Sequence, residues 1–98
     1  MPDTEIEQMR ENAREASKFL KAICHEGRLM ILCHLSTSEK SVTELETLLS
    51  WRQAAVSQQL ARLRSEGLVA SRRDGKTMYY RLTDPRAIQI IDLLCQDK

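Results

Sequence analysis

The most constraining feature of the sequence is a pair of short helical patterns followed at once by a strand pattern. Ser41 and Glu44 have the spacing of a capping box at a helix start, and apolar residues continue this pattern to residue 49. After a turn at residues 50–52, apolar residues recur at spacings of four and three, at Val56, Leu60 and Leu63. Two short helices joined by a tight turn predict a helix-turn-helix over about residues 42–66.

The next stretch changes to the period of a β-hairpin. Residues 68–73 and 77–82 are strand-like, and the Asp74-Gly75 pair between them is typical of a tight hairpin turn. The second strand is expected to alternate between its two faces, with an inward set formed by Met78, Tyr80 and Leu82. The sequence therefore predicts a β-hairpin wing over about residues 68–82.

Helical patterns also precede this unit. Thr4 and Glu7 have capping-box spacing, which predicts a first helix over about residues 5–23. Its apolar residues recur at spacings of three and four and form a stripe: Ile6, Met9, Ala13, Ala16 and Leu20. We expect the pattern to break at Gly27 and a second helix to run from there to a loop at residues 36–38.

A last helix is predicted over about residues 85–96, because Asp84 is a typical N-cap and Pro85 suits a first helical turn. It is apolar on nearly all sides, at Ile88, Ile90, Ile91, Leu93 and Leu94. A chain of 98 residues buries only roughly 60–65% of its unfolded surface, so a second copy would help to cover such helices. The predicted fold is one mainly α domain, residues 1–98, with a β-hairpin wing. This winged helix-turn-helix is expected to form a homodimer through its first and last helices.

Charge is unevenly distributed along the chain. The whole chain has 15 basic and 14 acidic residues, but residues 51–82 hold seven basic against two acidic ones. This local excess predicts a surface that faces a polyanion. The longest apolar run, at residues 29–33, has five residues, so we expect neither a signal peptide nor a membrane partner. Three cysteines fit the reducing cytoplasm better than a disulfide framework.

The face of the helix at residues 53–66 that lies opposite its apolar side has the chemistry of a DNA-reading surface. Small residues let a helix enter the major groove, Gln58 can pair with adenine, and Ser57 or Arg62 can bond a phosphate. Together with the basic wing tip, the predicted contacts to double-stranded DNA are Gln53, Ala54, Ser57, Gln58, Gln59, Arg62, Arg72, Arg73 and Lys76. The alternative is a solvated polar face on a winged helix that binds another protein.

A dimer of this fold would place its two recognition helices about one DNA turn apart, ~34–36 Å. The expected operator is therefore an AT-rich imperfect inverted repeat. Trp51 is expected to pack within the turn rather than to contact DNA.

Several segments together resemble the ArsR family of bacterial repressors. They include Phe19-Leu20-Lys21-Ala22, His25-Glu26-Gly27-Arg28-Leu29, Ser41-Val42-Thr43-Glu44-Leu45, Ala55-Val56-Ser57-Gln58-Gln59-Leu60, Glu66-Gly67-Leu68-Val69 and Tyr79-Tyr80. The resemblance extends from about residue 13 to residue 90. It implies a homodimeric winged-helix repressor whose first and last helices form the interface and which an inducer releases from its operator.

The cysteines indicate which branch of the family the chain resembles. Metal-sensing members commonly carry a Cys-x-Cys-like motif near the third helix, where this chain has Ser41-Val42-Thr43-Glu44, so we expect no metal or other cofactor. Cys33, within Leu29–Leu35, and Cys95 are similar to the dithiol of the persulfide-sensing SqrR and BigR type. By that resemblance, a persulfide donor modifies one thiolate and the second thiol closes a disulfide or polysulfide bridge. The bridge weakens DNA binding and derepresses genes for sulfide handling.

Other interpretations of the thiols stay open. The same pair can sense peroxide or general redox state, a metal sensor is a further alternative, and free cysteines are often small buried apolar residues. Cys24 is either a buried packing residue or a third thiol that pairs with Cys33 or Cys95. In the persulfide-sensing branch the last-helix cysteine lies about one helical turn, roughly 5.4 Å, further along than Cys95 does here. His25 is expected to be structural, and no arrangement typical of an enzyme is expected.

Overall fold

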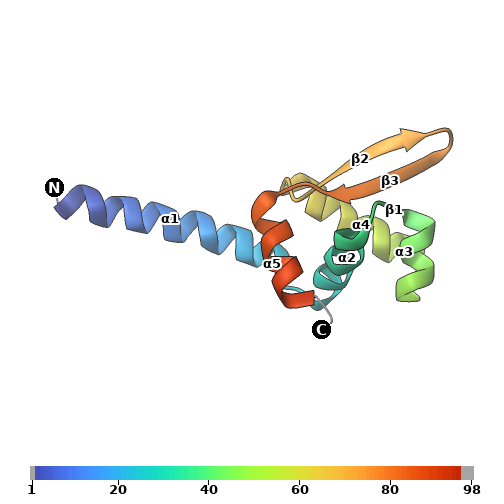
Figure 1. The fold of residues 1–98 in the computed structure, drawn as a ribbon, viewed down its shortest axis with the longest axis horizontal. Coiled ribbons are helices and arrows are strands. Elements are labelled where there is room, and N and C mark those ends of the chain that lie inside the picture. Colours follow the sequence, from blue (N-terminus) through green and yellow to red (C-terminus); the bar gives the residue numbers. More distant parts are fainter. Residues whose placement is uncertain (1, 96–98) are drawn as a thin grey trace.

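The chain folds as five helices and a small three-stranded sheet in the computed structural model, which describes residues 2–95 (Figure 1). The helices and strands are α1 (Pro2–Ile23), α2 (Glu26–Thr37), β1 (Lys40–Ser41), α3 (Val42–Leu49), α4 (Gln53–Ser65), β2 (Val69–Asp74), β3 (Thr77–Leu82) and α5 (Pro85–Cys95). This order confirms the predicted mainly α fold with a β-hairpin wing. Residue 96, where the last helix was expected to end, lies outside the described residues. Within residues 2–95 no helix is long and apolar enough to cross a membrane.

The helix-turn-helix forms as predicted. The Ser41 hydroxyl accepts a hydrogen bond from the Glu44 backbone N–H (3.1 Å), and the Glu44 carboxylate accepts one from the Ser41 N–H (2.8 Å). α3 ends at Ser50, whose left-handed backbone (φ 58°) turns the chain toward α4. α4 then buries its apolar side completely, at Val56, Leu60 and Leu63.

The end of α4 has a glycine cap at Gly67. The N–H of Gly67 donates to the carbonyl of Arg64 (3.0 Å), and the N–H of Leu68 donates to the carbonyl of Leu63 (3.0 Å). These two bonds form a Schellman motif, which satisfies carbonyls that the helix end would leave unpaired. The motif directs the chain from the recognition helix α4 straight into the wing.

The hairpin turn lies one residue later than the sequence predicted. Asp74 pairs with Thr77, so the two turn residues are Gly75 and Lys76 rather than Asp74 and Gly75. Gly75 has a positive φ of 65°, as the first central residue of a type II′ turn requires. The Asp-Gly pair favours a type I′ turn when both residues are central, and the strand register overrides that local preference.

The short strand β1 was not predicted from the sequence. The sheet order is β1-β3-β2, and β1 pairs Lys40 with Tyr80 and Ser41 with Tyr79. Two residues are too few to show a strand period, so only the tertiary pairing reveals the element. β1 fixes the wing to the chain between α2 and α3.

The start of α1 differs from the prediction. The helix begins at Pro2, so Thr4 and Glu7 lie inside it and do not form a cap at its start. The capping-box spacing at these two residues was therefore a wrong indicator of the helix boundary.

The break between the first two helices lies at His25 rather than at Gly27. The His25 Nδ1 accepts hydrogen bonds from the N–H groups of Gly27 (3.1 Å) and Arg28 (3.4 Å) and so caps α2. Gly27 consequently lies in the first turn of α2, and the expected structural role of His25 is confirmed. α2 also continues to Thr37, where a loop was expected.

One core holds the body of the protein together. Its most deeply buried large side chains come from four helices and from the residue directly before β2: Ile31, Leu32, Leu45, Val56, Leu60, Leu63, Leu68 and Ile91. α1 projects from this body, and only its last residues reach the core, through Phe19, Ala22 and Ile23 (Figure 1). Apolar side chains on α1 and α5 therefore stay exposed: Ile6, Met9, Leu20, Ile88, Leu93 and Leu94.

Candidate nucleic-acid interface and thiol pair

The predicted DNA face of α4 is exposed to solvent. Its members lie opposite the buried apolar side of the helix, and they are Gln53, Ala54, Ser57, Gln58 and Arg62. Arg62 lies 3.5 Å from the carboxylate of Glu66, one turn further along. An ion pair this exposed holds the arginine weakly, so Arg62 can still turn to a phosphate.

Gln59 lies on the side of α4 that faces α2. Its Oε1 accepts a hydrogen bond from Arg28 Nη1 (3.2 Å), and Arg28 also donates to the carbonyl of Ala22 at the end of α1 (2.6 Å). Gln59 therefore fastens the recognition helix to the α1–α2 junction. Gln59 is therefore not among the proposed DNA contacts.

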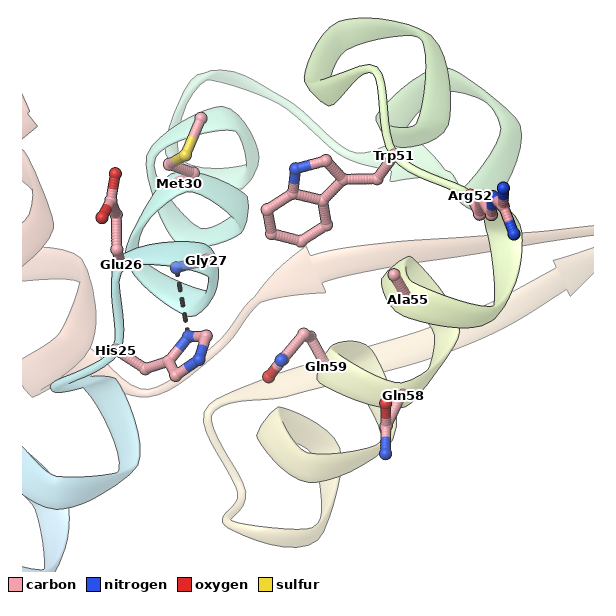
Figure 2. Close-up of a pocket in the computed structure, with 9 residues that line it drawn as sticks. All are labelled: His25, Glu26, Gly27, Met30, Trp51, Arg52, Ala55, Gln58 and Gln59. Carbon is pink, nitrogen blue, oxygen red and sulfur yellow. Dashed lines mark hydrogen bonds between the residues drawn. The ribbon is translucent and has the colours of Figure 1, made fainter.

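An open groove of about 630 Å³ adjoins this contact, between the start of α2 and α4. In Figure 2 the Trp51 indole points from the α3–α4 turn toward α2, and Gln59 points into the same space from α4. Trp51 packs against the core, which confirms its predicted place in the turn. Gly27 makes room for the indole, since a Cβ at this residue would lie 2.6 Å from Trp51 Cη2.

A second groove, of about 350 Å³, lies between α4 and the wing. α4 contributes Gln53 and Ser57 to its lining, the hairpin contributes Lys76 and Thr77, and α3 contributes Thr43. None of the described residues that line this groove is acidic. A cation surrounded by hydroxyl and amide groups suits the phosphate backbone of a nucleic acid. Thr43 had no signal in the sequence, because only the fold brings the start of α3 to this groove.

The strand register divides the basic residues of the wing between its two faces. Arg73 pairs with Met78, and Met78 lines the groove beside α4. Arg72 pairs with Tyr79, which alternation places on the opposite face. Of the predicted wing contacts, the turn residue Lys76 lines the groove beside α4, and Arg73 shares the hairpin face of Met78.

Arg72 is held on its own face by Glu39, which lies between α2 and β1. Its Nε and Nη2 atoms donate to the two Glu39 carboxylate oxygens, at 2.8 and 2.7 Å, and its guanidinium lies 4.9 Å from the centre of the Tyr79 ring. The hydrogen bond from Arg72 lowers the pKa of the Glu39 carboxyl below its ordinary value, and Glu39 raises the pKa of Arg72. No pattern in the sequence indicates this pair, because 33 residues separate its members.

The structure brings the two predicted sensing thiols together. The sulfur atoms of Cys33 and Cys95 lie at disulfide-bonding distance, and their Cα atoms are 5.8 Å apart, inside the range of about 4.4–6.8 Å for disulfides. Cys95 can therefore reach Cys33 despite its earlier place on the last helix.

Cys24 is free and exposed, so the interpretation of Cys24 as a buried packing residue is wrong. In the described part of the chain, no three His, Cys, Asp or Glu side chains are grouped so that they could hold a metal ion.

The start of α5 is fixed by the predicted N-cap. Asp84 Oδ1 accepts hydrogen bonds from the N–H groups of Arg86 (2.8 Å) and Ala87 (3.1 Å). Burial alone would raise the pKa of Asp84, but these backbone bonds and the Arg86 guanidinium outweigh burial and bring the pKa below its ordinary value. The cap sets the direction in which α5 leaves the wing and hence the position of Cys95.

Comparison with known proteins identifies the family. A family profile described as "Bacterial regulatory protein, arsR family" matches residues 25–71. The Biofilm growth-associated repressor of Agrobacterium fabrum is 43% identical over 86 residues, which cover 88% of this chain and 74% of that protein. The chain belongs to the ArsR family. The resemblance inferred from the sequence is thereby confirmed.

Solved structures extend the comparison to the fold of this ArsR-family chain. The transcriptional regulator HlyU from Vibrio vulnificus superposes with a TM-score of 0.88 at 42% identity, over 92% of this chain and 94% of that one. The transcriptional repressor BigR from Xylella fastidiosa gives a TM-score of 0.82 at 42% identity, over 90% and 87% of the two chains. The ArsR-family chain therefore has the winged helix-turn-helix fold of these regulators.

Proposed function

We propose that this protein is a dimeric transcriptional repressor that leaves its operator when a reactive sulfur species bridges Cys33 and Cys95. The observation that carries the proposal is the position of the thiol pair. Cys33 belongs to α2, which contacts the recognition helix, and Cys95 belongs to α5, which carries an exposed apolar face. The named roles of its relatives, a Biofilm growth-associated repressor and the Transcriptional activator HlyU of Vibrio cholerae, support control of transcription.

The proposed DNA contacts follow from the two exposed basic elements. α4 enters the major groove, where the Gln58 amide pairs with an adenine edge and Ser57 bonds a base or a phosphate. The wing reaches the adjacent minor groove of the DNA. The DNA backbone that separates the major groove from this minor groove would then lie along the protein surface between α4 and the wing. There Lys76 and Arg73 supply charge and Thr43 supplies a hydroxyl group.

The proposed homodimer covers the apolar side chains that one chain leaves open. Leu93 on α5 is 82% exposed and Met9 on α1 is 72% exposed, and both helices lie outside the helix-turn-helix. A two-fold interface would bury each of these side chains twice. Such a dimer would present two recognition helices to an AT-rich imperfect inverted repeat with half-sites ~34–36 Å apart.

The proposed sensing reaction is an exchange of sulfur followed by bridge closure. The Cys33 or Cys95 thiolate attacks the terminal sulfur of a persulfide RSSH, forms a cysteine persulfide and releases RSH. The other thiolate then attacks the cysteine sulfur of that persulfide, forms the Cys33–Cys95 disulfide and releases H₂S. The two thiols are oxidised, the sulfur of the donor is reduced, and one persulfide is consumed per bridge. The bridge ties α2 to α5 and thereby changes the spacing of the two recognition helices in the dimer.

This proposal places the protein in the cytoplasm, where its DNA lies and where thiols are kept reduced. The genes that it controls would act on sulfide. The same thiols support peroxide sensing as a second candidate, since oxidation by peroxide forms the same bridge.

A paired DNA-binding and mass experiment tests the proposal. Reduced protein is mixed with the promoter DNA beside its own gene, then treated with glutathione persulfide or with hydrogen peroxide at equal concentration. We expect tight, salt-dependent binding by reduced protein, with release and a Cys33–Cys95 linkage after persulfide. Release and linkage by peroxide alone would replace sulfur sensing with general redox sensing. Absence of binding at low salt would overturn the repressor proposal.

A further inference from the structure

Arg72 is engaged by three side chains on the face of the wing turned away from α4. Both oxygens of Glu39 accept from it, at 2.8 and 2.7 Å, its guanidinium lies 4.9 Å from the centre of the Tyr79 ring, and Asp74 lies 3.9 Å away. The fork of two parallel N–H···O bonds fixes the orientation of the guanidinium plane. Lys76, at the hairpin turn, has no ion pair in the described part of the chain.

The charge around Arg72 is unsuited to a phosphate. A DNA phosphate that approached this guanidinium would also approach the carboxylates of Glu39 and Asp74. The bidentate bond already uses the Nε–Nη2 edge of the guanidinium, and the Asp74 carboxylate lies 3.9 Å from Nη1 on its other side. Arg73, one residue further along β2, lies on the other face and makes no salt bridge within residues 2–95.

The partner of Arg72 connects the wing to the sensing helix. Glu39 comes two residues after Thr37, the last residue of α2, and directly before β1. Cys33 lies about one helical turn before Thr37 on α2. The Cys33 carbonyl accepts a hydrogen bond from the Ser36 hydroxyl (2.7 Å). The Glu39–Arg72 pair thus joins the end of α2 to β2. β2 is an edge strand of the sheet, and β1 pairs with β3 rather than with β2.

We propose that Arg72 is a wing-positioning residue, which acts through Glu39 to hold the wing at the end of α2, and that it makes no contact with DNA. This inference rests on the proposed function, since it concerns how the wing meets DNA. It revises the set of wing contacts to Arg73 and Lys76.

The salt dependence of DNA binding separates positioning from phosphate contact. Loss of one phosphate contact reduces the slope of log K against log salt concentration by about 1, so Lys76→Gln is expected to reduce it by that amount. Arg72→Gln is expected to keep the wild-type slope and to weaken binding by about two- to fivefold at every salt concentration. A slope reduced by Arg72→Gln as much as by Lys76→Gln would overturn the proposal.

A charge exchange supplies the second test. The double variant Glu39→Arg with Arg72→Glu restores the ion pair with the charges reversed, although its new carboxylate lies beside Asp74. We expect this variant to bind DNA more tightly than Arg72→Gln, whereas Glu39→Gln alone is as weak as Arg72→Gln. If Arg72 bound a phosphate, the exchanged variant would instead be the weakest of the set.

Amide hydrogen exchange tests the positioning role without DNA. The β1–β3 pairing, which contains Tyr79 and Tyr80, is expected to exchange faster in Arg72→Gln and Glu39→Gln than in wild type. In the charge-exchanged variant we expect it to exchange more slowly than in either single variant. Unchanged exchange in the single variants would overturn the positioning role. If wild-type protein failed to bind DNA, the proposed function would fall, and hydrogen exchange would still decide whether the pair positions the wing.

Discussion

Cys33 and Cys95 lie with their Cα atoms 5.8 Å apart and join α2 to α5 across 62 residues of sequence. α2 is bonded to the recognition helix through Arg28 and Gln59, and α5 carries the exposed Leu93. A bond between the two thiols therefore acts on the helix behind the DNA face and on the helix proposed for the dimer interface. In this arrangement a chemical change at the thiols needs no contact with DNA to alter binding.

The Cys33–Cys95 bridge is expected to stabilise the folded protein. It is also expected to account fully for the release from DNA after persulfide treatment. For a closed loop of 62 residues, chain entropy predicts that the bridged form is more stable than the reduced form by about 4 kcal/mol. Cys33→Ser is expected to bind DNA like the reduced wild type, to show no such stabilisation and to stay bound after persulfide treatment. Urea unfolding and gel shifts measure these effects.

Cys24→Ser is the matched control for that experiment, because Cys24 is an exposed free thiol outside the pair. The Cys24→Ser protein should still be stabilised by the Cys33–Cys95 bridge and should still leave its DNA after persulfide treatment. A Cys33→Ser protein that still left its DNA after persulfide would contradict the proposed thiol pair.

A charge on α5 is expected to separate the dimer without unfolding the chain. Leu93 is 82% exposed, so Leu93→Asp removes nothing from the core. Losing a buried leucine costs about 1.5–3 kcal/mol, and a two-fold interface counts the loss twice, so the dimer Kd should rise by about 100-fold or more. Sedimentation velocity measures the mass, and DNA affinity should fall in parallel.

Leu48→Asp is the control for the dimer experiment. Leu48 is an exposed leucine on α3, outside the two proposed interface helices, and its replacement should leave the dimer intact. Equal dissociation by both variants would show general loss of structure, and a dimeric Leu93→Asp protein would argue against the α5 interface.

The cap of α5 is expected to make stability depend on pH. The pKa of Asp84 lies below its ordinary value in the folded protein, so its ionised form stabilises the fold. This contribution is complete above the unfolded pKa of about 3.9 and is lost as pH falls through the lower folded value. Asp84→Asn keeps a good N-cap without a charge, whereas Asp84→Ala should cost about 0.5–2 kcal/mol at neutral pH.

Urea unfolding of wild type and Asp84→Asn at a series of pH values isolates the Asp84 carboxylate, because every other acidic group is shared. The stability difference between the two proteins should shrink as the solution is acidified below pH ~4. A difference that stays constant with pH would mean that the carboxylate charge does not stabilise the fold.

The predictable parts of the molecule are those set by near neighbours in sequence. The capping box at Ser41, the apolar face around Leu60 and the N-cap Asp84 each depend on residues within one or two turns. The missed parts depend on distant partners. The Gln59 amide is typical of a DNA-reading face. It instead accepts a hydrogen bond from Arg28, which lies 31 residues away in the sequence. Arg72 likewise looks like a free wing charge until β1 brings Glu39 beside it.

The close approach of Trp51 to Gly27 allows a last prediction. An added Cβ at Gly27 would lie 2.6 Å from Trp51 Cη2 and 3.1 Å from His25 Cε1. Crowding of this kind costs about 1–3 kcal/mol, whereas alanine in a helix gains up to about 1 kcal/mol over glycine. Gly27→Ala is therefore expected to destabilise the protein and to displace the indole, measured by urea unfolding and by the fluorescence of the single tryptophan.

Trp51→Leu shows whether the indole is the cause of that loss. In this background the ring edge is gone, so Gly27→Ala should cost nothing or stabilise the protein slightly through its helix propensity. An equal cost in both backgrounds would assign the crowding to the His25 ring, and hence to the cap of α2. Displacement of Trp51 would also shift the α3–α4 turn, so the same pair of variants should show whether the angle of the recognition helix affects DNA affinity.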